Sequence, residues 1–172
     1  MPKHPPTRKP EDRTGDRSDV SLAALPSAQS LEIYDTTLRD GAQAEDVSFS
    51  VEDKVRIAQK LDDLGVHFIE GGWPGANPKD IEFFRIIKTI PLEHASVVAF
   101  GSTRKASNPV DKDPTIQALL SADTQTITLF GKSWTFQVTD ALGIALSKNI
   151  ELIKDSIEYL QSKGRRVFYD AE

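Results

Sequence analysis

The stretch that decides the fold is LEIYDTTLRDGAQ, residues 31–43, in which a short apolar run passes into a polar loop. Four more short apolar runs follow at intervals of roughly 30 to 40 residues, which is the length of a βα unit. Runs of this kind suit parallel strands that are buried on both faces. The five predicted strands are Leu31–Tyr34, His67–Glu70, Ser96–Phe100, Thr126–Phe130 and Arg166–Tyr169.

Helix signals separate the predicted strands. Ser50 and Asp53 form a capping-box pattern at the start of the first helix, and Gly65 is its stop signal. Asn77 followed by Pro78 is an N-cap with proline at the first helical position. Two further helices are predicted from Pro114 to Leu120 and from Ile150 to the stop at Gly164. The alternation of strand and helix predicts an α/β fold, either a doubly wound sheet or a (β/α)8 barrel.

The chain is too short for a closed barrel. No G-x-G-x-x-G follows the first strand and no P-loop is present, so the usual nucleotide-binding fingerprints of a doubly wound sheet are missing. A closed barrel needs about 250 residues, whereas this chain has 172. We therefore expect a partial TIM (β/α)8 barrel of about four and a half βα units, in which residues 29–172 form the N-terminal part of a truncated catalytic domain.

Composition excludes several classes of protein. Residues 1–28 contain five of the ten prolines and no aromatic residue, and we predict a disordered N-terminal arm there. The net charge of -5 gives no reason to expect a nucleic acid or a membrane as partner. The absence of cysteine excludes disulfides, thiolate metal sites and cysteine nucleophiles, and it fits a cytoplasmic location.

Polar residues recur where the predicted strands end. In a barrel the active residues lie at the carboxyl ends of the strands, so this recurrence points to a site. The residues concerned are Arg39, Asp40, Glu70, Thr103, Arg104, Lys132, Asp170 and Glu172.

The first loop has the composition of a site for a metal and a small acid. Asp40 offers oxygen ligands for a divalent cation, and Arg39 offers a planar fork for a carboxylate or an enolate oxygen. Gly41 allows close approach of the backbone or a positive φ, and Gln43 can hydrogen-bond a small substrate. An Arg39–Asp40 surface pair in a turn is the alternative interpretation.

The segment Asp35–Gln43 closely resembles the first-strand motif of the DRE-TIM metallolyases, which include isopropylmalate, homocitrate and citramalate synthases and hydroxymethylglutaryl-CoA lyase. The resemblance runs from about residue 31 to the last residue and corresponds to the N-terminal half of the catalytic barrel. Residues 69–80, 100–104, 129–134 and 169–172 most resemble the citramalate synthase branch.

This resemblance implies an acyltransferase that condenses acetyl-CoA with pyruvate to give (R)-citramalate and CoA in isoleucine biosynthesis. It also implies a homodimer in the full-length enzyme and a divalent metal (Mg, Mn or Zn), with Asp40 as one ligand and further ligands beyond the C-terminus of this chain. The alternatives are 2-isopropylmalate or homocitrate synthesis, a related carbon–carbon lyase, and an inactive fragment.

Residue roles are also implied by the resemblance. Arg39 would bind the keto oxygen of the 2-oxo acid as a catalytic and substrate-binding residue, and Gln43 and Thr103 would bind substrate. Glu172 would position the acetyl group or assist proton transfer. Glu70 would act as a catalytic residue that orients Arg39.

The family's His-x-His metal ligands have no counterpart here. His4 lies in the arm, and His67 and His94 lie at the wrong ends of their strands, so we expect structural roles for them. The 172-residue chain alone should therefore lack a complete metal site and have little or no activity.

Trp73 is expected either to line a pocket or to pack in its loop. Lys132 and Arg104 are interpreted as solvated loop charges, with binding of CoA phosphates as the alternative.

Overall fold

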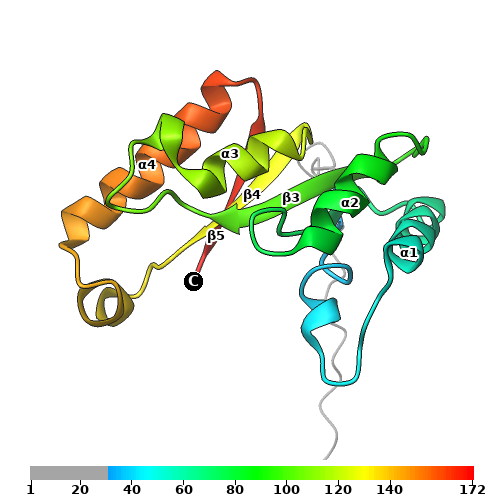
Figure 1. Cartoon of the computed structure of the whole chain (residues 1–172), viewed down its shortest axis with the longest axis horizontal. Helices are drawn as coiled ribbons and strands as arrows, with labels where there is room; N and C mark the ends of the chain where they lie inside the picture. The colour runs from blue at the N-terminus through cyan, green and yellow to red at the C-terminus, as the bar shows by residue number, and fades with distance from the viewer. Residues whose placement is uncertain (1–30) are drawn as a thin grey trace, which may run out of the picture. The chain divides into compact units, whose positions relative to one another are not determined.

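The computed structural model describes residues 31–172, where five parallel strands form one sheet in the order β1-β2-β3-β4-β5 (Figure 1). Each strand pairs with the next one along the chain. This confirms the predicted partial (β/α)8 barrel, whereas the predicted arm, residues 1–28, lies outside the described residues. The strands are β1 (Tyr34–Asp35), β2 (Phe68–Gly72), β3 (Ser96–Ser102), β4 (Thr126–Gly131) and β5 (Arg166–Ala171).

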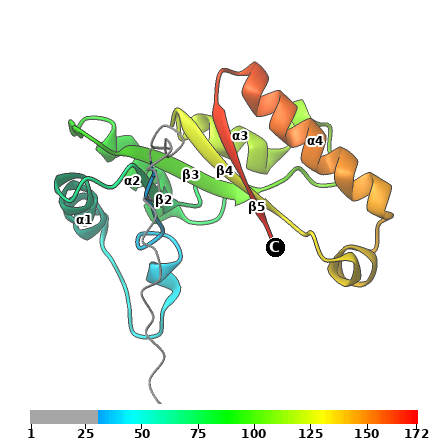
Figure 2. The ribbon, with the colours of Figure 1, turned by 180° about the vertical axis from the view of Figure 1, so that it is seen from behind.

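The helices lie around the outside of the curved sheet (Figures 1 and 2). They are α1 (Val51–Asp63), α2 (Pro78–Ile87), α3 (Pro114–Ser121) and α4 (Leu146–Ser162). The predicted capping box is present at the start of α1, because the Ser50 hydroxyl accepts from the backbone N–H of Asp53 at 3.1 Å and the Asp53 carboxylate accepts from the backbone N–H of Ser50 at 3.1 Å. None of the helices in residues 31–172 has the length and apolar character needed to cross a membrane.

Strand residues alternate between a hydrophobic core and an open inner face. Outward-facing side chains pack against the helices and exclude water from that face. Inward-facing side chains line the concave face of the sheet. The buried core contains Leu38, Ile69, Phe83, Phe84, Ala99, Ile116, Leu119, Ile127, Leu129 and Leu160.

Strand β1 differs from its prediction, because it starts at Tyr34 and not at Leu31. In the described part of the chain β1 has only β2 as a neighbour, so nothing on its free side covers Leu31, which is 81% exposed. The Ile33 carbonyl already accepts hydrogen bonds from the backbone N–H groups of His67 and Phe68, at 3.1 and 3.0 Å. The other four strands begin within one residue of the predicted positions.

A buried ion pair holds the loop at the carboxyl end of β2. Lys54 of α1 contacts Asp80 of α2, and both are almost fully buried. The Lys54 ammonium also donates to the Gly71 carbonyl at 2.8 Å, and the Asp80 carboxylate accepts from the Trp73 backbone N–H at 2.8 Å. Gly72 between them has φ of 145°, and a Cβ there would overlap the Asp80 carboxylate. The backbone path at the end of β2 is therefore tightly constrained.

Candidate active site

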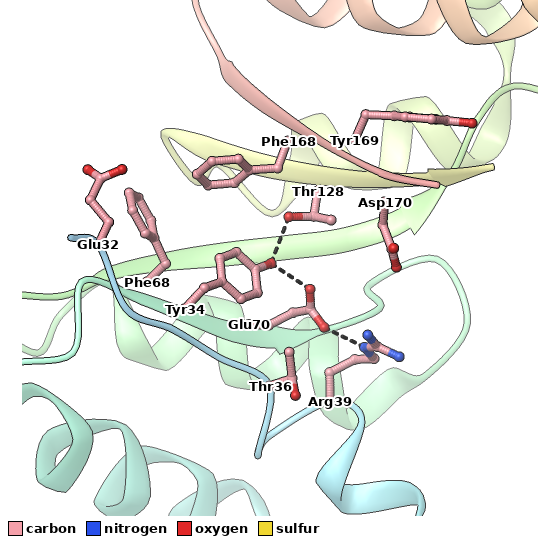
Figure 3. A pocket seen from close by; sticks show the side chains of 10 residues that line it. All are labelled: Glu32, Tyr34, Thr36, Arg39, Phe68, Glu70, Thr128, Phe168, Tyr169 and Asp170. Carbon is pink, nitrogen blue, oxygen red and sulfur yellow. Dashed lines mark hydrogen bonds and ion pairs between the residues drawn. The ribbon is translucent and has the colours of Figure 1, made fainter. Parts of the chain in front are cut away.

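The inner face of the sheet carries a cavity of about 450 Å³, and Figure 3 shows the residues that line it. Three aromatic rings pack at one end of it, since Tyr34, Phe68 and Phe168 have ring centroids 5.1 to 6.1 Å apart. Arg39, Glu70 and other polar side chains lie toward the carboxyl ends of the strands (Figure 3). Glu32 lines the opposite end, beside the aromatic rings (Figure 3). Arg39 and Glu70 thus lie at the end of the cavity where the active residues of a barrel are found.

Arg39 is held at this mouth by a carboxylate and an aromatic ring. Its Nε donates to Glu70 Oε1 at 2.5 Å, and its Cζ lies 3.8 Å from the centroid of the Phe100 ring. Nη1 lies 3.3 Å from Asp40 Oδ1, and Nη2 has no hydrogen-bond partner among residues 31–172. The structure therefore brings Arg39 and Glu70 together and leaves part of the guanidinium fork free to bind an anionic ligand.

Tyr34 and Thr128 complete this arrangement, although the sequence analysis did not single them out. The Tyr34 hydroxyl donates to Glu70 Oε2 at 2.5 Å and lies 2.7 Å from Thr128 Oγ1. Burial, together with the hydrogen bond to Glu70 and its charge, raises the pKa of Tyr34 well above its ordinary value. Strand alternation could have placed Tyr34 on the inner face, but its contact with a threonine 94 residues away is not visible in the sequence.

The loop after β1 exposes Asp40 and Gln43. The Asp40 side chain is 63% exposed, and neither residue lines the cavity. Gly41 does not have a positive φ, so the expectation that this glycine takes a positive φ is wrong. A Cβ at this position would lie 3.7 Å from its nearest neighbouring atom. Within residues 31–172 no group of three or more His, Asp or Glu side chains is placed to hold a metal ion.

Other predicted site residues lie around the rim. Thr103 and Lys132 line a second cavity of about 280 Å³ near the ends of β3 and β4. The Glu172 carboxylate contacts the Lys132 ammonium, so Lys132 is paired and not simply solvated. Asp170, two residues before Glu172, lines the main cavity. Among the predicted catalytic and binding residues, only Arg39 and Glu70 line the main cavity.

The interpretation of Arg104 as a solvated loop charge is wrong. Its side chain is 7% exposed and is bound by α4, with Nη2 at 2.5 Å from an Asp155 oxygen and 3.2 Å from a Glu151 oxygen. Nη1 donates to the Asn108 carbonyl at 3.0 Å. Because these groups occupy its donors, Arg104 ties the loop after β3 to α4 and is not free to bind a phosphate.

Trp73 is a packed aromatic residue of the loop after β2, and its ring lies against side chains of β3 and β4. Its ring lies edge-on to Phe100 and Phe130, with centroids 6.1 and 5.2 Å away, and it does not line the main cavity. Phe100 and Phe130 stack on each other at 5.0 Å. Trp73 therefore supports the ring on which the Arg39 guanidinium rests.

The two described histidines lie at the amino-terminal ends of β2 and β3. Nδ1 of His67 accepts from the Ile33 backbone N–H at 3.1 Å, and the His94 backbone N–H donates to Asp62 at 2.8 Å. Because these positions are at the opposite end of the strands from Arg39, neither histidine is part of the candidate site.

The chain is similar in sequence to curated proteins. The chain is 57% identical over 142 residues to an (R)-citramalate synthase from Geobacter sulfurreducens, which covers 83% of this chain and 27% of that protein. It is 30% identical over 141 residues to a probable 2-isopropylmalate synthase from Archaeoglobus fulgidus, which covers 82% of this chain and 26% of that protein. The chain thus spans about a quarter of the length of the curated relatives it matches.

A solved structure shares the fold. The hydroxymethylglutaryl-CoA lyase from Pseudomonas aeruginosa superimposes with a TM-score of 0.60 at 20% identity, covering 80% of this chain and 44% of that chain. The family model described as HMGL-like matches residues 30–172. The chain therefore belongs to the HMGL-like family.

Proposed function

We propose that this chain supplies the oxo-acid side of the active site in an acyltransferase that condenses acetyl-CoA with pyruvate to give (R)-citramalate and CoA. The observation that carries this proposal is the difference in identity, 57% to a citramalate synthase against 30% to a probable 2-isopropylmalate synthase over nearly the same segment. The cavity on the inner face of the sheet gives that segment a place to bind a small anion.

The reaction requires a group that binds the oxo acid and stabilises charge on its keto oxygen. A proton leaves the acetyl methyl group, a carbon–carbon bond forms to the keto carbon of pyruvate, and the keto oxygen becomes a hydroxyl. Water then releases CoA from the thioester. Arg39 fits the first task, because it lines the cavity with Nη2 unpaired among residues 31–172 while its Nε is held by Glu70.

The other predicted residues would act at the rim. Gln43 would approach the substrate carboxylate, and Thr103 would bind substrate from the end of β3. Glu172 would orient the acetyl group or assist proton transfer, and its carboxylate contacts the Lys132 ammonium. Because Gln43 and Thr103 do not line the main cavity, their roles require a bound substrate to extend past its mouth.

A divalent metal (Mg, Mn or Zn) would be held in part by Asp40, whose exposed carboxylate has the oxygen chemistry that such ions prefer. When bound, the metal would supply Lewis-acid polarisation of the keto acid. One carboxylate cannot complete such a site, so we propose that its other ligands come from outside residues 31–172. Arg39, 3.3 Å from Asp40, would orient this carboxylate.

A chimera tests the proposal. Residues 30–172 would replace the matching segment of the Geobacter sulfurreducens enzyme, and CoA release would be measured with acetyl-CoA and pyruvate, a branched-chain 2-oxo acid or a dicarboxylic 2-oxo acid. We expect pyruvate to be the preferred acid, with the parent enzyme as control. A folded chimera that prefers another acid, or turns over none, would contradict the proposal.

The cellular setting belongs to the same proposal. A citramalate-forming enzyme would serve branched-chain amino-acid biosynthesis in the cytoplasm, and we propose a homodimer for the full-length protein. Measuring the mass of the chimera and its parent in solution checks the dimer.

A further inference from the structure

Glu70 is a buried carboxylate that depends on two donors. It is 1% exposed, and each of its oxygens has one side-chain partner, Arg39 Nε on Oε1 and the Tyr34 hydroxyl on Oε2. A buried carboxylate is costly unless its oxygens are hydrogen-bonded. The rotamer of Glu70 is therefore set by the Tyr34 hydroxyl as well as by Arg39. Glu70 in turn fixes the direction of the Arg39 side chain.

The direction of each hydrogen bond follows from counting protons. The Tyr34 hydroxyl has one proton, and it donates that proton to Glu70 Oε2. The 2.7 Å contact between the Tyr34 and Thr128 oxygens must then be donated by Thr128. The chain of donors runs from Thr128 to Tyr34 to Glu70, so Thr128 orients the Tyr34 hydroxyl toward the carboxylate.

The Tyr34 ring is itself held in place. It stacks with Phe68 at 6.1 Å and meets Phe168 edge-on at 5.6 Å. These rings come from β2 and β5, while the hydroxyl of Tyr34 reaches β4 across the inner face (Figure 3). Tyr34 thus connects four strands at the point where Glu70 receives its hydrogen bond.

We propose that Tyr34, backed by Thr128, is a positioning residue that holds Glu70 in the rotamer from which Glu70 aims the Arg39 guanidinium into the cavity. The consequence for turnover rests on the proposed function, whereas the positioning does not. Without the Tyr34 hydroxyl, Glu70 Oε2 is a buried acceptor with no donor, so the carboxylate rotates and Arg39 loses its fixed orientation.

The test uses the 172-residue chain labelled with ¹⁵N at arginine. Arg39→Lys assigns the Arg39 Nε–H signal, and its exchange with water is then measured in Tyr34→Phe, which keeps the ring and removes only the hydroxyl. We expect exchange to accelerate by about tenfold, the factor that corresponds to about 1.4 kcal/mol. Tyr159→Phe, a hydroxyl removal on α4 far from Glu70, is the matched control and should leave the signal unchanged.

A second pair of variants keeps the proposal testable if Tyr34→Phe fails to fold. Thr128→Val removes the donor behind Tyr34 and should also accelerate the exchange, whereas Thr128→Ser retains the hydroxyl and should not. The proposal would be overturned if a folded Tyr34→Phe or Thr128→Val chain showed unchanged Arg39 exchange. It would also be overturned if, in the unsubstituted chain, Arg39 exchanged as fast as the exposed Arg56.

Activity separates this proposal from the proposed function. In the chimera, Tyr34→Phe should lower kcat/KM for the oxo acid, and Thr128→Ser should retain it. If the chimera forms no citramalate but the exchange results hold, the proposed function fails and the positioning role stands. If citramalate forms normally in the Tyr34→Phe chimera, the positioning role fails and the proposed function stands.

Discussion

Asp113 shows how one side chain can organise a loop in this fold. It is fully buried and accepts hydrogen bonds from the backbone N–H groups of Lys105, Thr115 and Ile116 and from the Asn108 amide, at 2.9 to 3.3 Å. It caps α3 and closes the loop that follows β3. Burial by itself raises the pKa of Asp113, but these hydrogen bonds outweigh it and hold the pKa below its ordinary value.

Replacing Asp113 by alanine should cost about 2 to 4 kcal/mol of unfolding free energy, from the lost cap and the donors left unpaired. Because the folded-state pKa of Asp113 lies below the unfolded value of about 3.9, the contribution is complete above about pH 4 and is lost as the pH falls through the folded-state pKa. Urea unfolding of both chains at pH 7 and at lower pH, at one chain concentration, measures this. Asp111→Ala, an exposed neighbour, should change stability by less than about 0.5 kcal/mol; an equal effect would contradict the argument.

Arg39 is the residue on which the proposed chemistry most depends. Lysine keeps the charge but loses the planar fork that donates to Glu70 and to an anion at once. Arg39→Lys in the chimera should lower kcat/KM for pyruvate by about a hundredfold or more. Arg56→Lys on the exposed face of α1 is the control, and activity close to the parent in both variants would remove Arg39 from the site.

At the scale of elements, the end of β2 is the most constrained segment. Gly72→Ala forces a side chain into positive φ and against the carboxylate of Asp80, which is paired with Lys54. We expect a loss of about 3 kcal/mol or more, visible as a lower unfolding midpoint. Gly41→Ala, where φ is not positive and there is room for a Cβ, should cost less than about 1 kcal/mol. Similar midpoints for the two variants would show that the β2 loop can relax.

The elements were largely predictable because their signals are local. The capping box at Ser50 and the Asn77-Pro78 start of α2 require only a few adjacent residues to be read. The start of strand β1 was predicted three residues too early, because the extent of this strand depends on the neighbouring strand that pairs with it and not on its own sequence. The hydrogen bonds of Tyr34 to Glu70 and Thr128 were not found, because these partners lie 36 and 94 residues away. The carboxylate partners of Arg104 were missed for the same reason, since they lie 47 and 51 residues away.

At the scale of the whole molecule, the candidate site is only part of what the proposed reaction needs. The described residues provide Arg39 at the main cavity and the exposed Asp40, but no three-ligand metal cluster. The 172-residue chain should therefore release no CoA from acetyl-CoA and pyruvate above the uncatalysed rate, in an assay coupled to thiol detection. Robust turnover by this chain would contradict the expectation, and the chimera serves as the positive control.

The sheet also has two free edges in the described part of the chain, because β1 pairs only with β2 and β5 only with β4. Closing a barrel removes such edges, whereas an open one offers unpaired backbone groups to other chains. The 172-residue chain should therefore elute from size-exclusion chromatography as a dimer or a larger species. A well-folded monomer at all concentrations would show that the edges are protected.

The order of the strands has a further consequence for how the chain is made. Since every strand pairs with the one synthesised just before it, no strand waits for a distant partner to leave the ribosome. Each completed βα unit can therefore pair with the exposed edge of the preceding strand while the following βα unit is still being translated. The unpaired backbone groups of β5 are then the edge left exposed once the fifth strand has docked, and the same groups invite self-association.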